Sequence, residues 1–274
     1  MKSSTILKQY YFNPIAWVLW GLSLVKIIKM NKPKLLAVIP ARGGSKRILH
    51  KNIKDFLGRP LIAYSIESAQ KAGIFEDIIV STDDPEIAKV AQELGAQVPF
   101  MRDAVLSNDF TGTGAVACDA YHKMKDLGHE YDGTCTIYAT APLLTPEHLV
   151  KAYEMFVKDQ VDYLFSGCEL PFPFQRSFFL DEANKPTPVM PECIPMRSQD
   201  LPKAYQDAGQ FYFKSIAYTE YDGLSPDDRK QVDDSKFVTR LYEMPRHRVI
   251  DIDTPEDWEY ALVLAKAVNE LKLD

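Results

Sequence analysis

The chain has 274 residues, of which 46% are hydrophobic, and its formal net charge is −6 at pH 7. This length and composition indicate one large globular domain, or a domain with an added lobe, that buries a core of its own. The acidic total argues against nucleic acid as the main partner, because proteins that bind duplexes carry a basic face.

Residues 1–33 differ in character from the rest of the chain. An apolar run from Ile15 to Val25 is flanked by lysines on both sides. The run is shorter than the roughly 20 residues with which a helix crosses a bilayer, and no signal-peptide cleavage site follows it. We expect an N-terminal apolar extension that is disordered or loosely docked, or that is an artefact of a start site upstream of Met30. An interfacial anchor and a docking helix for a partner are the alternatives.

From residue 34 to residue 270, predicted strands and helices alternate. Strands are expected at residues 35–40, 77–83, 96–100, 134–140 and 161–167, with helices between them at 60–73, 84–95, 114–128 and 146–159. Strand patterns return at 209–215, 237–244 and 247–253, before a last helix at 254–271. This succession predicts an α/β fold with a mostly parallel sheet that is covered by helices on both faces.

Several predicted helix ends are marked by their residue types. Pro60 is expected to open the first helix and Gly73 to end it. Asp84 is the predicted N-cap of the second helix. Thr254 and Asp257 have the spacing of a capping box at the start of the last helix.

The segment 168–202 interrupts the alternation with seven prolines and four phenylalanines. It shows no clean helix or strand period, which is typical of a lid or of an arm that packs on another subunit. A loop folded back on its own core is the alternative.

Cysteines and histidines do not form a metal or nucleophile motif in this sequence. The cysteines have no CxxC spacing, which indicates reduced thiols in a cytoplasmic protein: Cys118, Cys135, Cys168 and Cys193. Three histidines stand at positions typical of surface residues, and none is expected to be a catalytic base: His122, His129 and His148.

The loop after the first predicted strand carries unusual positive charge. In the stretch LLAVIPARGGSKRILHKN, Gly43 and Gly44 lie among cationic side chains that include Arg42, Lys46 and Lys51. Ligands of open α/β sheets sit at the carboxyl ends of strands, and cationic donors beside a backbone free of side chains suit a polyphosphate. The spacing matches neither G-x-x-x-x-G-K-[ST] nor G-x-G-x-x-G. A solvated basic turn is the alternative.

A second group of polar residues lies in VIDIDTPEDW, residues 249–258. Asp251 and Asp253 are two residues apart, so in an extended chain both carboxylates point to one face, with Ile250 and Ile252 buried opposite. Paired carboxylates at a strand end suit Mg²⁺, which also takes phosphate oxygens and waters. A solvated strand end is the alternative.

At this point the chain resembles a known family. The stretches IPARGGSKRILHKN, STDDPEIA, VPFMRD, YATAPLLT, DAGQFYF and DIDTPEDW occur in the order seen in the CMP-sugar cytidylyltransferases that activate nonulosonic acids. The likeness covers roughly residues 34 to 270. YATAPL and DAGQFYF look like the pseudaminic acid branch of that family rather than the sialic acid branch.

The resemblance implies a reaction, a fold and a set of partners. CMP would pass from CTP to the anomeric hydroxyl of a nine-carbon keto sugar acid, and pyrophosphate would be released. The implied fold is a Rossmann-like nucleotidyltransferase with a mostly parallel sheet and a smaller dimerisation or lid arm. The implied cofactor is Mg²⁺, the implied assembly is a cytoplasmic homodimer, and no membrane partner is expected.

The resemblance also implies roles for individual residues. The catalytic set is Arg42, Lys46, Asp251 and Asp253, and the two aspartates take Mg²⁺. Ser45 joins Arg42 and Lys46 on the triphosphate, Lys51 and Asn52 lie near the nucleotide, Ser81 and Asp83 near the ribose, and Arg102 beside cytosine or phosphate. The remaining substrate-binding set is Tyr138, Thr140, Asp207, Gln210 and Tyr212. Asp253 and Asp207 are both candidates for a general base.

This chain departs from the sialic acid pattern at three positions. Tyr138 and Leu144 stand where those enzymes carry a glutamine and an arginine, and Asp103 stands where a proline is usual. The missing arginine argues against sialic acid itself. CMP-sialic or CMP-legionaminic acid synthesis, and a nucleotidyltransferase for another sugar, remain alternatives. Two further alternatives fit the residues less well: a regulator without catalysis would keep the loop but not the aspartate pair, and a structural protein explains neither.

Overall fold

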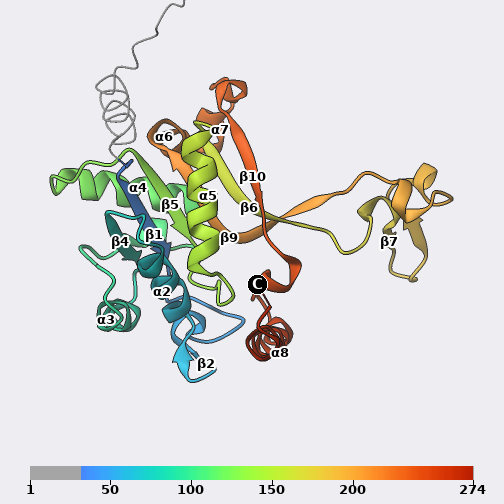
Figure 1. The fold of residues 1–274 in the computed structure, drawn as a ribbon, viewed down its shortest axis with the longest axis horizontal. Helices are drawn as coiled ribbons and strands as arrows, with labels where there is room; N and C mark the ends of the chain where they lie inside the picture. The colour runs from blue at the N-terminus through green and yellow to red at the C-terminus, as the bar shows by residue number, and fades with distance from the viewer. Residues whose placement is uncertain (1–31, 274) are drawn as a thin grey trace, which may run out of the picture. The chain divides into compact units, whose positions relative to one another are not determined.

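A six-stranded sheet lies at the centre of the computed structural model, which describes residues 32–273 (Figure 1). Its strands are β1 (Leu35–Pro40), β4 (Asp77–Ser81), β5 (Gly133–Ile137), β6 (Tyr163–Glu169), β9 (Tyr205–Ser215) and β10 (Thr239–Glu243). The order across the sheet is β10-β6-β9-β5-β1-β4. β9 runs antiparallel to its neighbours β5 and β6, while β1 is parallel to β4 and β5, and β10 to β6. The predicted mostly parallel α/β sheet is confirmed.

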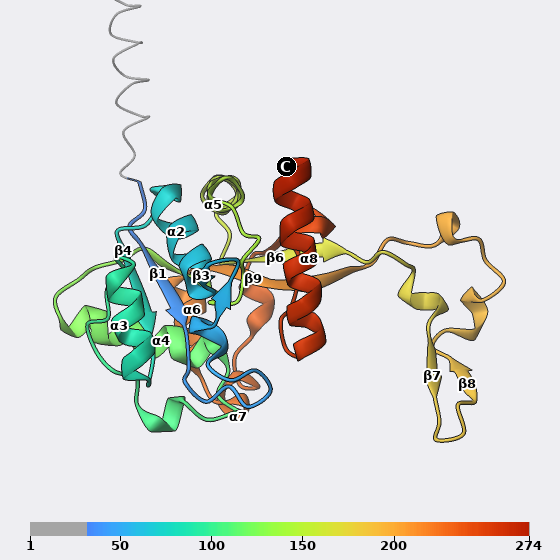
Figure 2. The ribbon, with the colours of Figure 1, turned by 90° about the horizontal axis from the view of Figure 1, so that it is seen from below.

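Helices cover both faces of this sheet (Figure 2). They are α2 (Ile62–Ala72), α3 (Pro85–Glu93), α4 (Thr113–Asp126), α5 (Pro146–Lys158), α6 (Ile216–Gly223), α7 (Pro226–Arg229) and α8 (Pro255–Leu271). Alternate side chains of β1 point to opposite faces, so Ala37 packs in the cluster with α2, α3 and α5, and Val38 in the cluster with α4. The apolar run LLAVIP therefore fits a strand that is buried on both faces.

α8 packs in a third cluster, which lies against the basic loop rather than the main sheet. Trp258 and Ala261 of this helix contact a group that includes Ile48 and Phe56. Ile252 is fully buried in the same cluster. Burial of this residue ties the segment before α8 to the loop after β1.

The predicted caps of three helices are confirmed. The Asp84 carboxylate accepts hydrogen bonds from the amides of Glu86 and Ile87 at the start of α3. Thr254 and Asp257 form the capping box of α8, and Gly73 ends α2 in the left-handed region at φ 62°. These signals act within one turn of the chain, which is why the sequence alone reveals them.

Three local predictions were wrong. Pro60 does not open α2 but belongs to the two-residue strand β3 (Arg59–Pro60), which pairs with β2 (Asp55–Phe56). The expected strand at 96–100 is reduced to one bridge between Gln97 and Ile79, since Pro99 has no amide hydrogen to continue a ladder. The expected strand at 247–253 is also absent: a 3₁₀ turn at Arg246–Arg248 leads into an irregular segment.

The segment between β6 and β9 extends away from the sheet in both views (Figures 1 and 2). It carries a short hairpin of β7 (Phe178–Leu180) and β8 (Pro186–Pro188). Phe172 is 80% exposed and Phe179 is 68% exposed. The alternative of a loop folded back on its own core does not describe this segment.

The cysteine side chains and that of His148 lie in the interior. All four cysteines are free and buried. His148 was expected at the surface, but it is buried on α5, where its Nδ1 lies 3.0 Å from the hydroxyl of Tyr242. Burial and the nearby charge of Arg248 lower the pKa of His148 to about 4.

Within residues 32–273, no helix is long and apolar enough to cross a membrane. The apolar run predicted at 15–25 falls outside these residues.

Candidate active site

A pocket of about 290 Å³ opens at the carboxyl ends of the neighbouring strands β1 and β5. Four segments line it: the basic loop 40–52, residues 102–116, the turn 138–140 and the pair Asp251 and Asp253. Ligands of open α/β sheets bind at this edge because the loops of neighbouring parallel strands converge there. The pocket brings ten of the predicted site residues together: Arg42, Ser45, Lys46, Lys51, Asn52, Arg102, Tyr138, Thr140, Asp251 and Asp253.

The basic loop is held close to β4 by its glycine. The amide of Gly43 donates to the Asp83 carboxylate at 3.1 Å, and a Cβ at this position would lie 2.4 Å from a carboxylate oxygen of Asp84. Neither Gly43 nor Gly44 has a positive φ. Gly43 is required for close approach. The buried amide of Asn52 donates to the carbonyl of Arg42 at 2.9 Å and fixes the other side of the loop.

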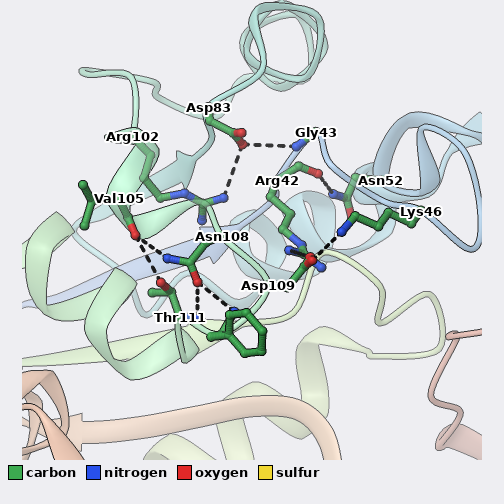
Figure 3. A network of polar contacts seen from close by, with 11 residues as sticks. Arg42, Gly43, Lys46, Asn52, Asp83, Arg102, Val105, Asn108, Asp109 and Thr111 are labelled. Carbon is green, nitrogen blue, oxygen red and sulfur yellow. Dashed lines mark hydrogen bonds and ion pairs between the residues drawn. The ribbon is translucent and has the colours of Figure 1, made fainter.

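The two cations expected at the triphosphate share one carboxylate partner in this structure (Figure 3). Arg42 Nη1 lies 2.5 Å from Asp109 Oδ1, and Lys46 Nζ lies 2.6 Å from Asp109 Oδ2. Hydrogen bonds from Lys46 and Arg42 lower the pKa of the Asp109 carboxyl. Asp109 therefore stays ionised, and the pocket holds a carboxylate where cationic donors converge.

A second group of charges lies around Asp253. Arg47 Nη2 is 3.0 Å and Lys51 Nζ is 3.4 Å from its carboxylate, and Lys51 also donates to the carbonyl of Ile252 at 2.6 Å. The pKa of the neighbouring Asp251 is raised, because the pocket walls partly shield it from water and Asp253 lies close by. Repulsion between two carboxylates favours a cation between them. The residues therefore fit a divalent metal, although they reach the pocket from an irregular segment rather than the predicted strand.

Arg102 is a buried cation in the pocket wall, with its side chain 3% exposed. Its Nη2 lies 3.4 Å from Asp83 and its Nε donates to the Ser107 hydroxyl at 3.1 Å. Burial lowers the pKa of Arg102. Asp83 thus supports both Arg102 and Gly43 from outside the pocket lining.

Ser81 is fully buried in β4, and its hydroxyl has no hydrogen-bond partner among residues 32–273.

The loop that carries Asp109 was not predicted to belong to the site. Asn108 closes it: its carboxamide nitrogen donates to the Val105 carbonyl at 2.6 Å, and its oxygen accepts from the amides of Phe110 and Thr111 at 2.8 and 3.0 Å (Figure 3). The other pocket residues missed in this region are Leu106, Asn108, Thr111, Thr113 and Val116. The run SNDFTGTG between Arg102 and α4 was the available signal, since turn-forming Asn, Asp and Gly cluster there.

The predicted sugar-binding residues of β9 lie beside the pocket rather than in its lining. The Tyr212 hydroxyl donates to the Asp207 carboxylate at 3.0 Å, and the rings of Tyr212 and Tyr138 are 5.4 Å apart. Gln210 is buried and donates to the carbonyl of Arg248 at 2.5 Å. Contact of Asp207, Gln210 and Tyr212 with a sugar therefore stays a prediction.

Comparison with known proteins shows what this chain is similar to. A family model described as cytidylyltransferase matches residues 36–265. A pseudaminic acid cytidylyltransferase from Campylobacter jejuni subsp. jejuni serotype O:2 is 45% identical over 86% of this chain and 98% of its own. A CMP-N,N'-diacetyllegionaminic acid synthase from Legionella pneumophila is 29% identical over 82% of this chain and 93% of its own.

A solved structure shares the fold. It is that of CMP:2-keto-3-deoxy-manno-octonic acid synthetase in complex with CTP, with a TM-score of 0.63 and 20% identity over 85% of this chain and 98% of that one. The family model and the relative at 45% identity indicate a nucleotidyltransferase. The chain belongs to the cytidylyltransferase family.

Proposed function

We propose that this protein transfers CMP from CTP to the anomeric hydroxyl of pseudaminic acid and releases pyrophosphate. The observation that carries the proposal is the pocket itself, which joins Arg42 and Lys46, the buried Arg102 and the carboxylates of Asp251 and Asp253. The choice of sugar is supported by the relative named pseudaminic acid cytidylyltransferase at 45% identity.

Charge placement accounts for most of the chemistry. The sugar oxygen attacks the α-phosphorus in line, and pyrophosphate leaves with additional negative charge. Arg42 and Lys46 would bind the β- and γ-phosphoryl oxygens and neutralise this charge, since both cations reach the pocket. Asn52 and Gly43 hold the backbone of the loop, so that the donors need little reorganisation.

A divalent metal, Mg²⁺ in this proposal, would be held by Asp251 and Asp253. When bound, it would neutralise phosphate oxygens and help to orient the reacting groups. Lys51 and Arg47 keep the Asp253 carboxylate in place from the other side. Asp207 is held by the hydroxyl of Tyr212, and as general base it would take the proton of the sugar hydroxyl; Asp253 is the alternative base.

Pyrophosphate release from CTP with Mg²⁺ tests the reaction and the sugar together. Pseudaminic acid, sialic acid, legionaminic acid and 3-deoxy-manno-octulosonic acid would be offered in parallel. Release with pseudaminic acid alone is the expected result. Release with sialic or legionaminic acid instead would keep the mechanism but show that Tyr138 and Leu144 do not select the sugar. No release with any of the four would contradict the proposed reaction.

We also propose a homodimer in the cytoplasm. The segment 168–202 extends from the sheet with exposed Phe172, Phe178 and Phe179, and an apolar surface of this kind favours association with a second copy. Free, buried cysteines are compatible with a reducing compartment. The residue roles above and the boundary between an extension at 1–33 and a domain at 34–270 belong to the same proposal.

A further inference from the structure

One acidic side chain occupies the cations of the proposed triphosphate site. Asp109 lies 67 residues after Arg42 and 63 residues after Lys46 in the chain. One of its carboxylate oxygens bonds to Arg42 and the other to Lys46. The cations do not pair with the Asp251 and Asp253 group, which has Arg47 and Lys51 as its own partners. Asp109 thus pairs with both cations to which we assign the phosphates and offsets one of their two positive charges.

The position of Asp109 follows from the fold of its loop. Asn108 ties Val105 to Phe110 and Thr111, and the Thr111 hydroxyl lies 3.3 Å from the same Val105 carbonyl. The Asp109 carboxylate takes no part in these bonds. It points instead to the basic loop after β1 (Figure 3). The loop is short and exposed, so it can move without disturbing the core of the sheet.

The carboxylate also resembles the ligand in chemistry. Two anionic oxygens on one carbon bridge a guanidinium and an ammonium, as two oxygens of one phosphoryl group would. Arg42 and Asp109 are 37% and 41% exposed and Lys46 is 79% exposed, so water screens these pairs. Each pair is therefore weak enough for a more highly charged anion to displace it.

We propose that Asp109 competes with the phosphates of the nucleotide for Arg42 and Lys46, leaves them when CTP binds, and returns to them as pyrophosphate departs. The inference rests on the proposed function, because it assigns these two cations to the β- and γ-phosphates. Asp109 holds the cations together in the free protein and lowers the affinity for both CTP and the leaving pyrophosphate. It is a residue that sets affinity and product release, rather than one that takes part in bond formation.

The matched variants are Asp109→Asn and Asp103→Asn. Both remove one negative charge from the same segment, but Asp103 pairs with Lys123 on α4 at 2.9 Å instead of with the loop cations. A general increase in positive potential would affect both variants alike. A specific competition affects Asp109→Asn alone.

Titration calorimetry would measure the binding of CTP, pyrophosphate and CMP to the unsubstituted protein and to both variants. Loss of two exposed ion pairs should tighten CTP and pyrophosphate binding to Asp109→Asn by about 2- to 30-fold. CMP lacks the β- and γ-phosphates, so its affinity should stay within about 2-fold, as should all affinities of Asp103→Asn. In turnover, Asp109→Asn should show stronger product inhibition by pyrophosphate by a similar factor.

The outcomes separate this inference from the proposed function. If Asp109→Asn bound CTP and pyrophosphate no more tightly than the unsubstituted protein, the proposed competition would be wrong. The proposed function would still stand in that case, provided that the unsubstituted protein bound both ligands. An equal gain for Asp103→Asn would also overturn the competition, since the effect would then be general. If the unsubstituted protein bound neither CTP nor pyrophosphate, the triphosphate site itself would fail, and the inference with it.

Discussion

Most charged residues of the pocket pair with an opposite charge. Arg42 and Lys46 bond to Asp109, while Arg47 and Lys51 bond to Asp253. Asp251 differs, because Asp253 and partial burial raise its pKa and disfavour its charged form. The pocket lining carries five cationic side chains and three carboxylates, so it keeps an excess of positive charge that suits an anion, while the neighbouring Asp251 and Asp253 suit a metal.

Replacing Asp251 tests the metal assignment. Asp251→Asn should lower turnover by about 10²- to 10⁴-fold, because it removes an anionic ligand at the reacting phosphate. It should also make the free protein more stable at pH 7. The folded-state pKa lies above the unfolded one, so the stability that this carboxyl contributes in acid is lost as the pH rises through its folded pKa. Pyrophosphate release and thermal unfolding would measure both effects. Near wild-type turnover would contradict the metal assignment.

His148 gives the protein a pH dependence that is separate from the site. Its pKa is lowered from 6.5 to about 4 by burial and by Arg248. The stability that depends on neutral His148 is present above pH 6.5 and is lost as the pH falls toward 4, by up to about 3 kcal/mol. Urea unfolding at pH 7 and pH 4.5 would show a smaller difference for His148→Gln than for the unsubstituted protein. His122→Gln, exposed on α4, is the matched control, and equal behaviour of the two variants would refute this prediction.

At the scale of elements, the start of α8 controls the metal-binding segment. The Asp257 carboxylate accepts from the amides of Asp253 and Thr254 at 3.1 and 2.7 Å and from the Thr254 hydroxyl at 2.8 Å. The capping box thus orders the backbone of a proposed ligand. Ile252, fully buried between Asp251 and Asp253 in the sequence, anchors the same segment in the cluster beneath α8.

Asp257→Ala should therefore affect both stability and metal use. Loss of the cap should lower the free energy of unfolding by about 0.5–2 kcal/mol. It should also raise the Mg²⁺ concentration needed for half-maximal activity, since the Asp253 amide loses its acceptor. Chemical unfolding and a Mg²⁺ titration of activity would measure the two effects. Glu256→Ala, in the same helical turn, is the control. If it weakened Mg²⁺ use equally, the cause would be the loss of negative charge at the start of α8 and not the loss of the cap.

At the scale of the molecule, our proposal assigns association to the arm at 168–202 and catalysis to the pocket. The arm joins the sheet only through β6 and β9, while the pocket lies at the carboxyl ends of β1 and β5. Its exposed aromatic side chains are the feature that we assign to the homodimer.

Substitution in the arm tests this assignment. Phe172→Asp with Phe179→Asp should weaken dimerisation by about 10- to 100-fold, because charged groups would replace apolar anchors. Sedimentation velocity over a range of concentrations would measure it. Leu127→Asp places the same charge at an exposed apolar residue outside the arm and should leave dimerisation unchanged. A strictly monomeric unsubstituted protein would contradict the proposed homodimer.

The sequence by itself determined the features that depend on near neighbours in the chain. Apolar runs and helical periods indicated the alternating strands and helices, and the caps at Asp84 and Thr254 marked helix starts within a residue. The basic loop and the aspartate pair were identified because each is a short run of unusual composition. Their chemistry depends on residue type and spacing, which a sequence contains in full.

Only the tertiary structure decided which distant residues meet. Insertion of β9 between β5 and β6, the projection of the arm and the irregular segment around Asp251 depend on packing of the whole sheet. Lys51 meets Asp253 across 202 positions, and Arg42 meets Asp109 across 67. Asp109 lies in a run of turn-forming residues that predicts a loop, but the run does not reveal which distant side chains Asp109 meets. Its partners were set by the convergence of loops at one edge of the sheet.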